Sequence, residues 1–195
     1  SGIGGSNTSA LAYAGWSGTA VLAVTETWTG PGAPIGAWTT TTSMNTTRYN
    51  RGAAGTTTSA LAFGGRSPSV ASNEEWNGST WTELADLNSG RFSMAPAGNT
   101  TSALSAGGEN GGYTGIVEEW NGSSWTETTD LNTTRGETGG AGANTEAALV
   151  FAGRSPSGTF ANTESWNGSS WTEVNDLNQA RYQVASGMGR VYTNA

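Results

Sequence analysis

NEEWNGSTWTELADLNSGR, at residues 73–91, decides the fold, because its pattern returns as VEEWNGSSWTETTDLNTTR at residues 117–135 and TESWNGSSWTEVNDLNQAR at residues 163–181. The first tryptophan of these copies falls at Trp76, Trp120 and Trp166, so the steps are 44 and 46 residues. A fainter copy lies upstream, at residues 28–48. Repetition at a period of roughly 20 to 50 residues indicates a repeat architecture such as a solenoid or a propeller.

A second element lies between these copies, namely a run of small apolar residues that ends in glycine. It occurs at residues 9–15, 59–65, 102–108 and 146–153. The two elements together divide the chain into four units of about 45 residues, which is the usual length of one propeller blade.

Each unit can be divided into four strands. The first strand follows the repeated arginine, the second is the small apolar run, the third ends at the first tryptophan and the fourth begins at the second tryptophan. Asn-Gly stands between the two tryptophans and favours a tight hairpin, since both residues tolerate a positive φ. Small and β-branched residues dominate the chain, which favours strands over helices. We therefore predict an all-β fold.

The tryptophans that flank each hairpin are predicted to pair across it and to fill the core between sheets. Ala, Gly and Ser are too small to fill such a core, and buried indole rings supply large apolar areas. A ligand-binding role is the alternative for these rings. We expect a structural role for Trp28, Trp38, Trp76, Trp81, Trp120, Trp125, Trp166 and Trp171.

These features resemble the kelch repeat. That family has an apolar strand ending in Gly-Gly, followed by an aromatic residue and a Trp on the next two strands. Gly64-Gly65 with Trp76 and Trp81 match this pattern. The copies are also similar to kelch-like repeats of bacteriophage and bacterial surface proteins. The resemblance implies a β-propeller with four antiparallel strands in each blade, on a virion or in another extracellular setting.

The four repeat units predict a single domain over residues 1–195, with four blades, although kelch propellers more often have six or seven. Residues 8–47 supply only three clear strands, so we expect residues 181–189 to complete that blade and close the ring. Closure would remove exposed sheet edges. The other blades are predicted at residues 48–90, 91–134 and 135–180. Two alternatives stay open, namely a fragment of a larger propeller and an assembly in which chains share strands.

Composition excludes several classes of function. The 195 residues carry a net charge of −7, with neither Lys, Cys nor His. Nucleic acids and anionic membranes are not expected as partners, because binding a phosphate backbone needs clustered cations. Without Cys or His, the chain has no zinc site of the Cys/His type and no thiolate nucleophile. We expect no metal and no cofactor. The copper enzyme galactose oxidase, also kelch-like, needs His and Cys.

Six arginines are predicted to share one face of the molecule. Successive loops of an up-and-down sheet alternate between its two ends, so the loops after the second and fourth strands meet at the same end. These loops carry Arg48, Arg66, Arg91, Arg135, Arg154 and Arg181. They are our candidate partner-binding residues, because guanidinium groups bind carboxylates in a bidentate manner. The structural alternative pairs them with the recurring Asp86, Asp130 and Asp176.

These observations predict a non-catalytic module that binds a protein or glycan, or that joins other subunits of a larger assembly. The alternative is a glycoside-processing enzyme that uses two carboxylates. Glu83, Glu127 and Glu173 are repeat-equivalent, whereas a catalytic pair needs unlike environments, so their symmetry favours a structural role.

Overall fold

A computed structural model describes residues 2–6, 9–30, 37–67 and 70–184. All regular elements in these ranges are β-strands, which confirms the all-β prediction. They form four antiparallel sheets of four strands each and one two-stranded ribbon. Within these ranges, no helix is long and apolar enough to cross a membrane.

The strands follow one another in chain order within each sheet. Sheet 1 consists of β1 (Gly2–Ser6), β2 (Ser9–Trp16), β3 (Val21–Thr29) and β4 (Ala37–Thr41). Sheet 2 consists of β5 (Gly52–Gly55), β6 (Ala60–Phe63), β7 (Asn73–Trp76) and β8 (Trp81–Leu84). Sheet 3 consists of β9 (Ala95–Gly98), β10 (Ala103–Glu109), β11 (Tyr113–Trp120) and β12 (Trp125–Thr128). Sheet 4 consists of β13 (Gly139–Asn144), β14 (Ala147–Phe151), β17 (Thr163–Trp166) and β18 (Trp171–Val174). The ribbon pairs β15 (Arg154–Ser155) with β16 (Gly158–Thr159).

The predicted Asn-Gly hairpins are present in sheets 2, 3 and 4. In sheet 2, Trp76 lies directly opposite Trp81. Gly78 has a φ of 97°, which a side chain would disfavour. The Asn77 side-chain oxygen accepts the backbone N–H of Thr80 at 2.9 Å and so closes the turn. The repeated Asn-Gly therefore sets the register of these three hairpins.

Sheet 1 differs from the prediction at its edge. The place beside β2, where we expected residues 181–189, is occupied by β1 from the chain's own beginning. Ile3 lies opposite Leu11 in this pairing, as Ala54 lies opposite Leu61 in sheet 2. Residues 181–184 form no strand, and residues 185–189 lie outside the described part of the chain.

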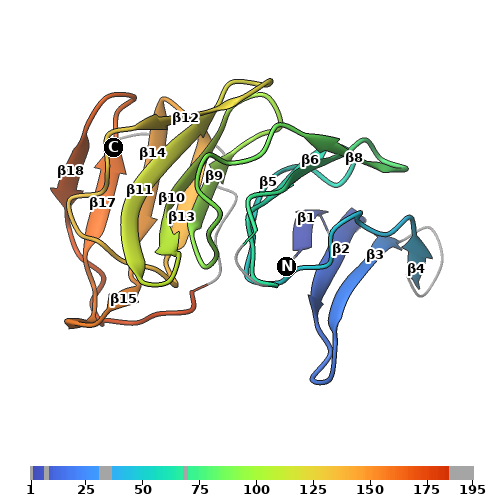
Figure 1. Ribbon diagram of the computed structural model, residues 1–195, viewed down its shortest axis with the longest axis horizontal. Coiled ribbons are helices and arrows are strands. Elements are labelled where there is room, and N and C mark those ends of the chain that lie inside the picture. The colour runs from blue at the N-terminus through green and yellow to red at the C-terminus, as the bar shows by residue number, and fades with distance from the viewer. Residues whose placement is uncertain (1, 7–8, 31–36, 68–69, 185–195) are drawn as a thin grey trace.

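The four sheets are arranged one after another in chain order. Figure 1 shows sheets 3 and 4 side by side at one end of the molecule, sheet 1 at the other end and sheet 2 between them. A ladder of backbone hydrogen bonds joins successive sheets beside their first strands: Ser93 N–H donates to Asn50 O at 2.8 Å, Glu137 N–H to Ser93 O at 2.8 Å, and Gln183 N–H to Glu137 O at 2.9 Å. All four residues have positive φ values, between 51° and 57°. This conformation is unfavourable outside glycine, so the contact between sheets imposes it.

The first strands of sheets 3 and 4 approach so closely that they require a glycine. A Cβ placed on Gly140 of β13 would lie 2.4 Å from the carbonyl oxygen of Pro96 in β9. The obstacle is backbone rather than a flexible side chain, so the two strands would have to move apart.

We expect Gly140→Ala to lower the free energy of unfolding by about 1–3 kcal/mol, the usual cost of overpacking a filled core. Gly112→Ala is the matched control, because a Cβ at Gly112 meets no atom within 4 Å. Urea unfolding of both variants measures the difference. Equal stability of the two variants would show that the strands separate without cost.

In sheets 2, 3 and 4 the paired tryptophans fill the space within and between sheets. The ring centroids of Trp120 and Trp125 lie 5.5 Å apart, and both rings are buried. Trp125 also packs on Phe63 of sheet 2, with centroids 4.8 Å apart. Sheet 1 departs from this pattern, since Trp28 and Trp38 pair at 5.7 Å but Trp38 is 49% exposed.

Candidate functional site

Three of the six candidate arginines are buried, which corrects the prediction that they contact a partner. Their guanidinium groups form ion pairs with glutamates of the third strand in their own sheet, and both side chains of each pair are fully buried. The pairs are Arg48–Glu74 at 3.1 Å, Arg91–Glu118, and Arg135–Glu164 at 2.9 Å. The Asp residues that we considered as partners are not used in these pairs.

Each buried glutamate also binds the connection that enters its sheet. Glu118 accepts the backbone N–H groups of Asn88 and Ser89 at 2.7 and 3.3 Å. The Asn88 amide donates to the carbonyl oxygen of Trp125 at 2.9 Å. We call the arrangement of Asn88, Ser89, Arg91 and Glu118 a clasp.

The clasp recurs at the other two connections. Glu74 accepts the N–H groups of Asn45 and Thr46, and Glu164 accepts those of Asn132 and Thr133. Burial lowers the pKa of Arg48 to about 10, although Glu74 opposes the shift. Buried charges need partners, and the clasp gives each guanidinium a carboxylate, although the buried Nε atoms of Arg48 and Arg135 have no acceptor among the described residues.

The other three candidate arginines lie at the surface. The Arg66 guanidinium lies 4.9 Å from the centre of the Phe92 ring. Arg154 pairs with Glu137 and lies 4.5 Å from the centre of the Tyr182 ring. Arg181 is exposed and donates to the Gln179 carbonyl oxygen at 3.3 Å. These three remain accessible to a partner.

Arg51 is a buried arginine that the repeat did not reveal. Its guanidinium lies 4.2 Å from the centre of the Tyr13 ring and donates to the Tyr13 carbonyl oxygen. Burial lowers its pKa. The equivalent positions of the next two units hold Met94 and Thr138, so the repeat gives no signal for this residue.

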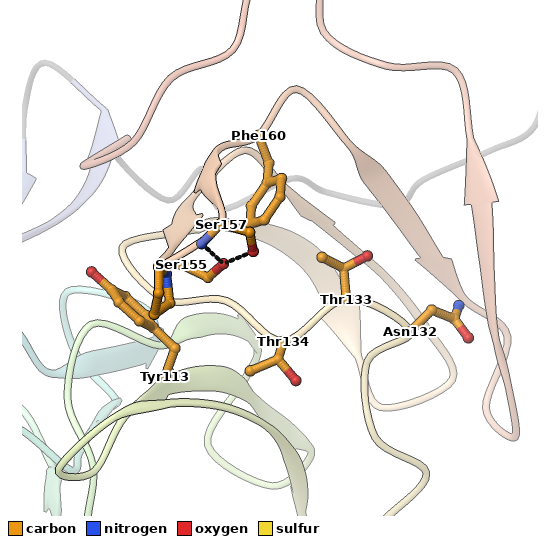
Figure 2. Close-up of a pocket in the computed structure, with 8 residues that line it drawn as sticks. Tyr113, Asn132, Thr133, Thr134, Ser155, Ser157 and Phe160 are labelled. Atoms are coloured by element: carbon orange, nitrogen blue, oxygen red, sulfur yellow. Dashed lines mark hydrogen bonds between the residues drawn. The ribbon is translucent and has the colours of Figure 1, made fainter.

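A hollow of about 540 Å³ lies where the loops of sheets 3 and 4 meet (Figure 2). Tyr113 contributes from the start of β11, Thr133 and Thr134 from the connection to sheet 4, and the ribbon contributes from the other side. The lining residues are Tyr113, Asn132, Thr133, Thr134, Ser155, Pro156, Ser157 and Phe160. The predicted convergence of these two loop types at one end of the sheets is therefore present here.

The ribbon holds its hydroxyl groups between two aromatic rings. In Figure 2, Ser155 and Ser157 lie between the rings of Tyr113 and Phe160. Their hydroxyl oxygens are 2.7 Å apart, and Ser157 N–H donates to Ser155 Oγ at 3.2 Å. The backbone N–H of Phe160 donates to the Gly153 carbonyl oxygen at 2.9 Å, which fixes the end of the ribbon.

The surroundings of the hollow raise the pKa of its tyrosine, whose phenol is protonated at neutral pH in any case. Burial and the carboxylate of Glu109 raise the pKa of Tyr113. Burial and the neighbouring Glu137 also raise the pKa of Glu109. Arg154 Nε donates to Glu137 Oε1 at 2.7 Å, so this positive charge is already compensated. Tyr113 therefore presents a phenolic O–H, which both donates and accepts hydrogen bonds.

The lining combines aromatic faces with short hydroxyl and amide side chains. Such a surface suits a neutral, hydroxyl-rich ligand, because the rings bind apolar faces while the polar groups fix orientation. The described lining includes no carboxylate and no guanidinium group. No repeated motif marks this site, because Tyr113 at the start of β11 and Phe160 after the ribbon lie beside loops that differ between units.

Comparison with known proteins adds no family to this description. No family model matches the chain, and no curated protein matches it significantly.

Proposed function

We propose that this chain is a non-catalytic binding and structural module whose four sheets are kelch-like propeller blades. The repeated clasp and the backbone ladder beside the first strands support this interpretation, because both place successive sheets in the same relation to one another. A virion or cell surface is the setting we propose for it, on the resemblance of the repeats alone.

We propose a glycan as the ligand of the hollow between sheets 3 and 4. The observation that carries this proposal is the pairing of two aromatic rings with serine and threonine hydroxyls in one open hollow. A glycoside-cleaving enzyme would need two carboxylates facing its pocket, and the described lining offers none. Nucleic acid and membrane binding remain unfavoured by the net charge of −7.

A glycan array probed with the whole chain tests this proposal. We expect Tyr113→Ala and Phe160→Ala each to weaken binding of the retained glycan about tenfold, since an aromatic contact contributes roughly 1 kcal/mol beyond its buried area. Isothermal titration with that glycan measures the change.

Trp16→Ala is the control, because Trp16 is an exposed ring on sheet 1, remote from the hollow. It should bind like the unaltered chain. A retained glycan whose affinity is unchanged in both hollow variants would place the site elsewhere, and an array with no retained glycan would favour a protein partner.

A further inference from the structure

Three complete clasps connect the four sheets. The residues for both sides of a fourth clasp are also present, but the two sides do not meet. The clasp joins a connection bearing Asn, a second backbone N–H and Arg to a glutamate two residues before the first tryptophan. Behind sheet 4, the equivalent connection carries Asn178, Gln179 and Arg181. In sheet 1, the equivalent glutamate is Glu26, two residues before Trp28.

The connection behind sheet 4 makes the same two backbone hydrogen bonds as the connections that enter sheets 3 and 4. Leu177 N–H donates to Ala161 O at 3.0 Å, as Leu131 N–H donates to Gly115 O at 3.0 Å. Gly153 N–H donates to Arg181 O at 2.9 Å, as Gly108 N–H donates to Arg135 O at the same distance. The main chain is thus set for a fourth clasp.

The side chains of this connection nevertheless face solvent. Asn178, Gln179 and Arg181 are exposed, whereas Arg48, Arg91 and Arg135 are fully buried. The only acceptor that the described residues give the Arg181 guanidinium is the Gln179 carbonyl oxygen. This half of a clasp lacks its carboxylate.

Sheet 1 offers the missing half. Glu26 is half-buried on β3, and within the described residues it forms no ion pair. Trp38 is repeat-equivalent to Trp125 but is 49% exposed, whereas Trp125 is 4% exposed. Trp125 is covered because it packs on the preceding sheet, whereas among the described residues no sheet precedes sheet 1.

Beside each of two clasps, a tryptophan packs on an aromatic ring of the preceding sheet. The two rings for a further contact of this kind are also present, on sheets 1 and 4. Trp81 packs on Tyr13 at 4.9 Å, and Trp125 packs on Phe63 at 4.8 Å. Tyr13 and Phe63 each stand directly before a pair of small residues, Ala14-Gly15 and Gly64-Gly65. In sheet 4 that position is Phe151, which is only half-buried. Phe151 is therefore available to receive a tryptophan equivalent to Trp81 and Trp125.

We propose that the outer end of sheet 4 binds sheet 1 of a second copy of this chain. Glu26 of that copy completes the clasp with Asn178, Gln179 and Arg181, and its Trp38 packs on Phe151. The occupant is a second copy because sheets 1 and 4 lie at opposite ends of the molecule (Figure 1), and because β1 already completes sheet 1. The contact joins unlike surfaces, so it builds closed rings or open filaments rather than a dimer through one self-complementary patch.

Sedimentation of the whole chain over a range of concentrations tests this proposal. We expect the unaltered chain to self-associate, and we expect Arg181→Ala and Glu26→Ala each to weaken association at least about a hundredfold, since each leaves a buried charge unpaired. Both substitutions alter groups that are exposed or half-buried in one copy, so the melting temperature of each diluted variant should stay unchanged. Arg66→Ala removes an exposed arginine away from both ends and should associate normally.

Mixing the two variants gives the sharpest result. Arg181→Ala retains an intact sheet 1, and Glu26→Ala retains an intact connection behind sheet 4. One of each should form a 1:1 dimer and stop there, because both remaining ends are defective. A chain that stays monomeric at every concentration overturns the proposal. So does a monomer in which both substitutions lower the melting temperature, because the two ends would then close on each other within one copy.

Discussion

Replacing Glu118 with alanine should destabilise the chain by about 3–5 kcal/mol, the cost of removing one member of a buried ion pair. The Arg91 guanidinium would remain in the core without a counter-charge, and the N–H groups of Asn88 and Ser89 would lose their acceptor. A domain of this size has a total stability of about 5–15 kcal/mol, so the loss is a large part of it. Thermal and urea unfolding measure this effect.

Glu127→Ala is the matched control, because Glu127 lies directly opposite Glu118 across β11 and β12 but is exposed. It should change the free energy of unfolding by less than about 0.5 kcal/mol. The double variant Arg91→Met with Glu118→Leu should lose less stability than Glu118→Ala alone, since neither charge is then left unpaired. If both single glutamate variants were equally stable, the clasp would not contribute to folding.

Replacing Trp125 with alanine should cost about 3–5 kcal/mol, the usual range for deleting a large buried ring. The ring contacts Trp120 within its own sheet and Phe63 in sheet 2, so the cavity would open at the junction of two sheets. Trp125→Phe should cost less, because among the described residues the indole N–H of Trp125 has no acceptor to lose. Calorimetric melting distinguishes the two variants.

Trp38→Ala provides the comparison at the equivalent position of sheet 1. Because Trp38 is half exposed, its removal from a single copy should cost less than about 1 kcal/mol. Similar losses at Trp38 and Trp125 would contradict the view that the second tryptophan stabilises the fold by packing on the preceding sheet.

Much of the fold followed from the sequence because the repeat carries local information. Asn77-Gly78 and the tryptophans beside it specify a hairpin within a few residues, so the strands on either side could be located. β1 was missed for the same reason, since Gly2–Ser6 contains neither the arginine nor the tryptophan that marks a unit. The predicted closure by residues 181–189 depended on that omission.

The partner of the repeated arginines could not be chosen from the sequence. Asp86 and Glu74 recur with the same period, and either carboxylate satisfies a periodic pairing with Arg48. The pairing of β7 with β6 turns Glu74 into the core beside Arg48, while Asp86 remains exposed. The two carboxylates recur with the same period, so only the pairing of the strands shows which of them reaches the arginine.

The hollow could not be predicted from the sequence, because the aromatic residues that form it do not repeat. Tyr113 at the start of β11 and Phe160 after β16 flank loops whose length and content vary from unit to unit, so no period marks them. Their convergence depends on the ribbon of β15 and β16, which only sheet 4 has among the described residues. The repeats therefore indicate the four sheets, whereas the aromatic residues of the proposed binding site do not repeat.

The backbone ladder through Asn50, Ser93, Glu137 and Gln183 has a consequence for redesign. Its hydrogen bonds use only main-chain atoms, so the four side chains differ while the geometry stays constant. Glu137 is not open to substitution because it is buried and pairs with Arg154, which leaves the exposed Asn50 and Gln183 as substitutable positions with a fixed spacing. Ligand-coordinating or fluorescent residues can be introduced there one at a time. Their separation will be set by the backbone hydrogen bonds rather than by the residue chosen.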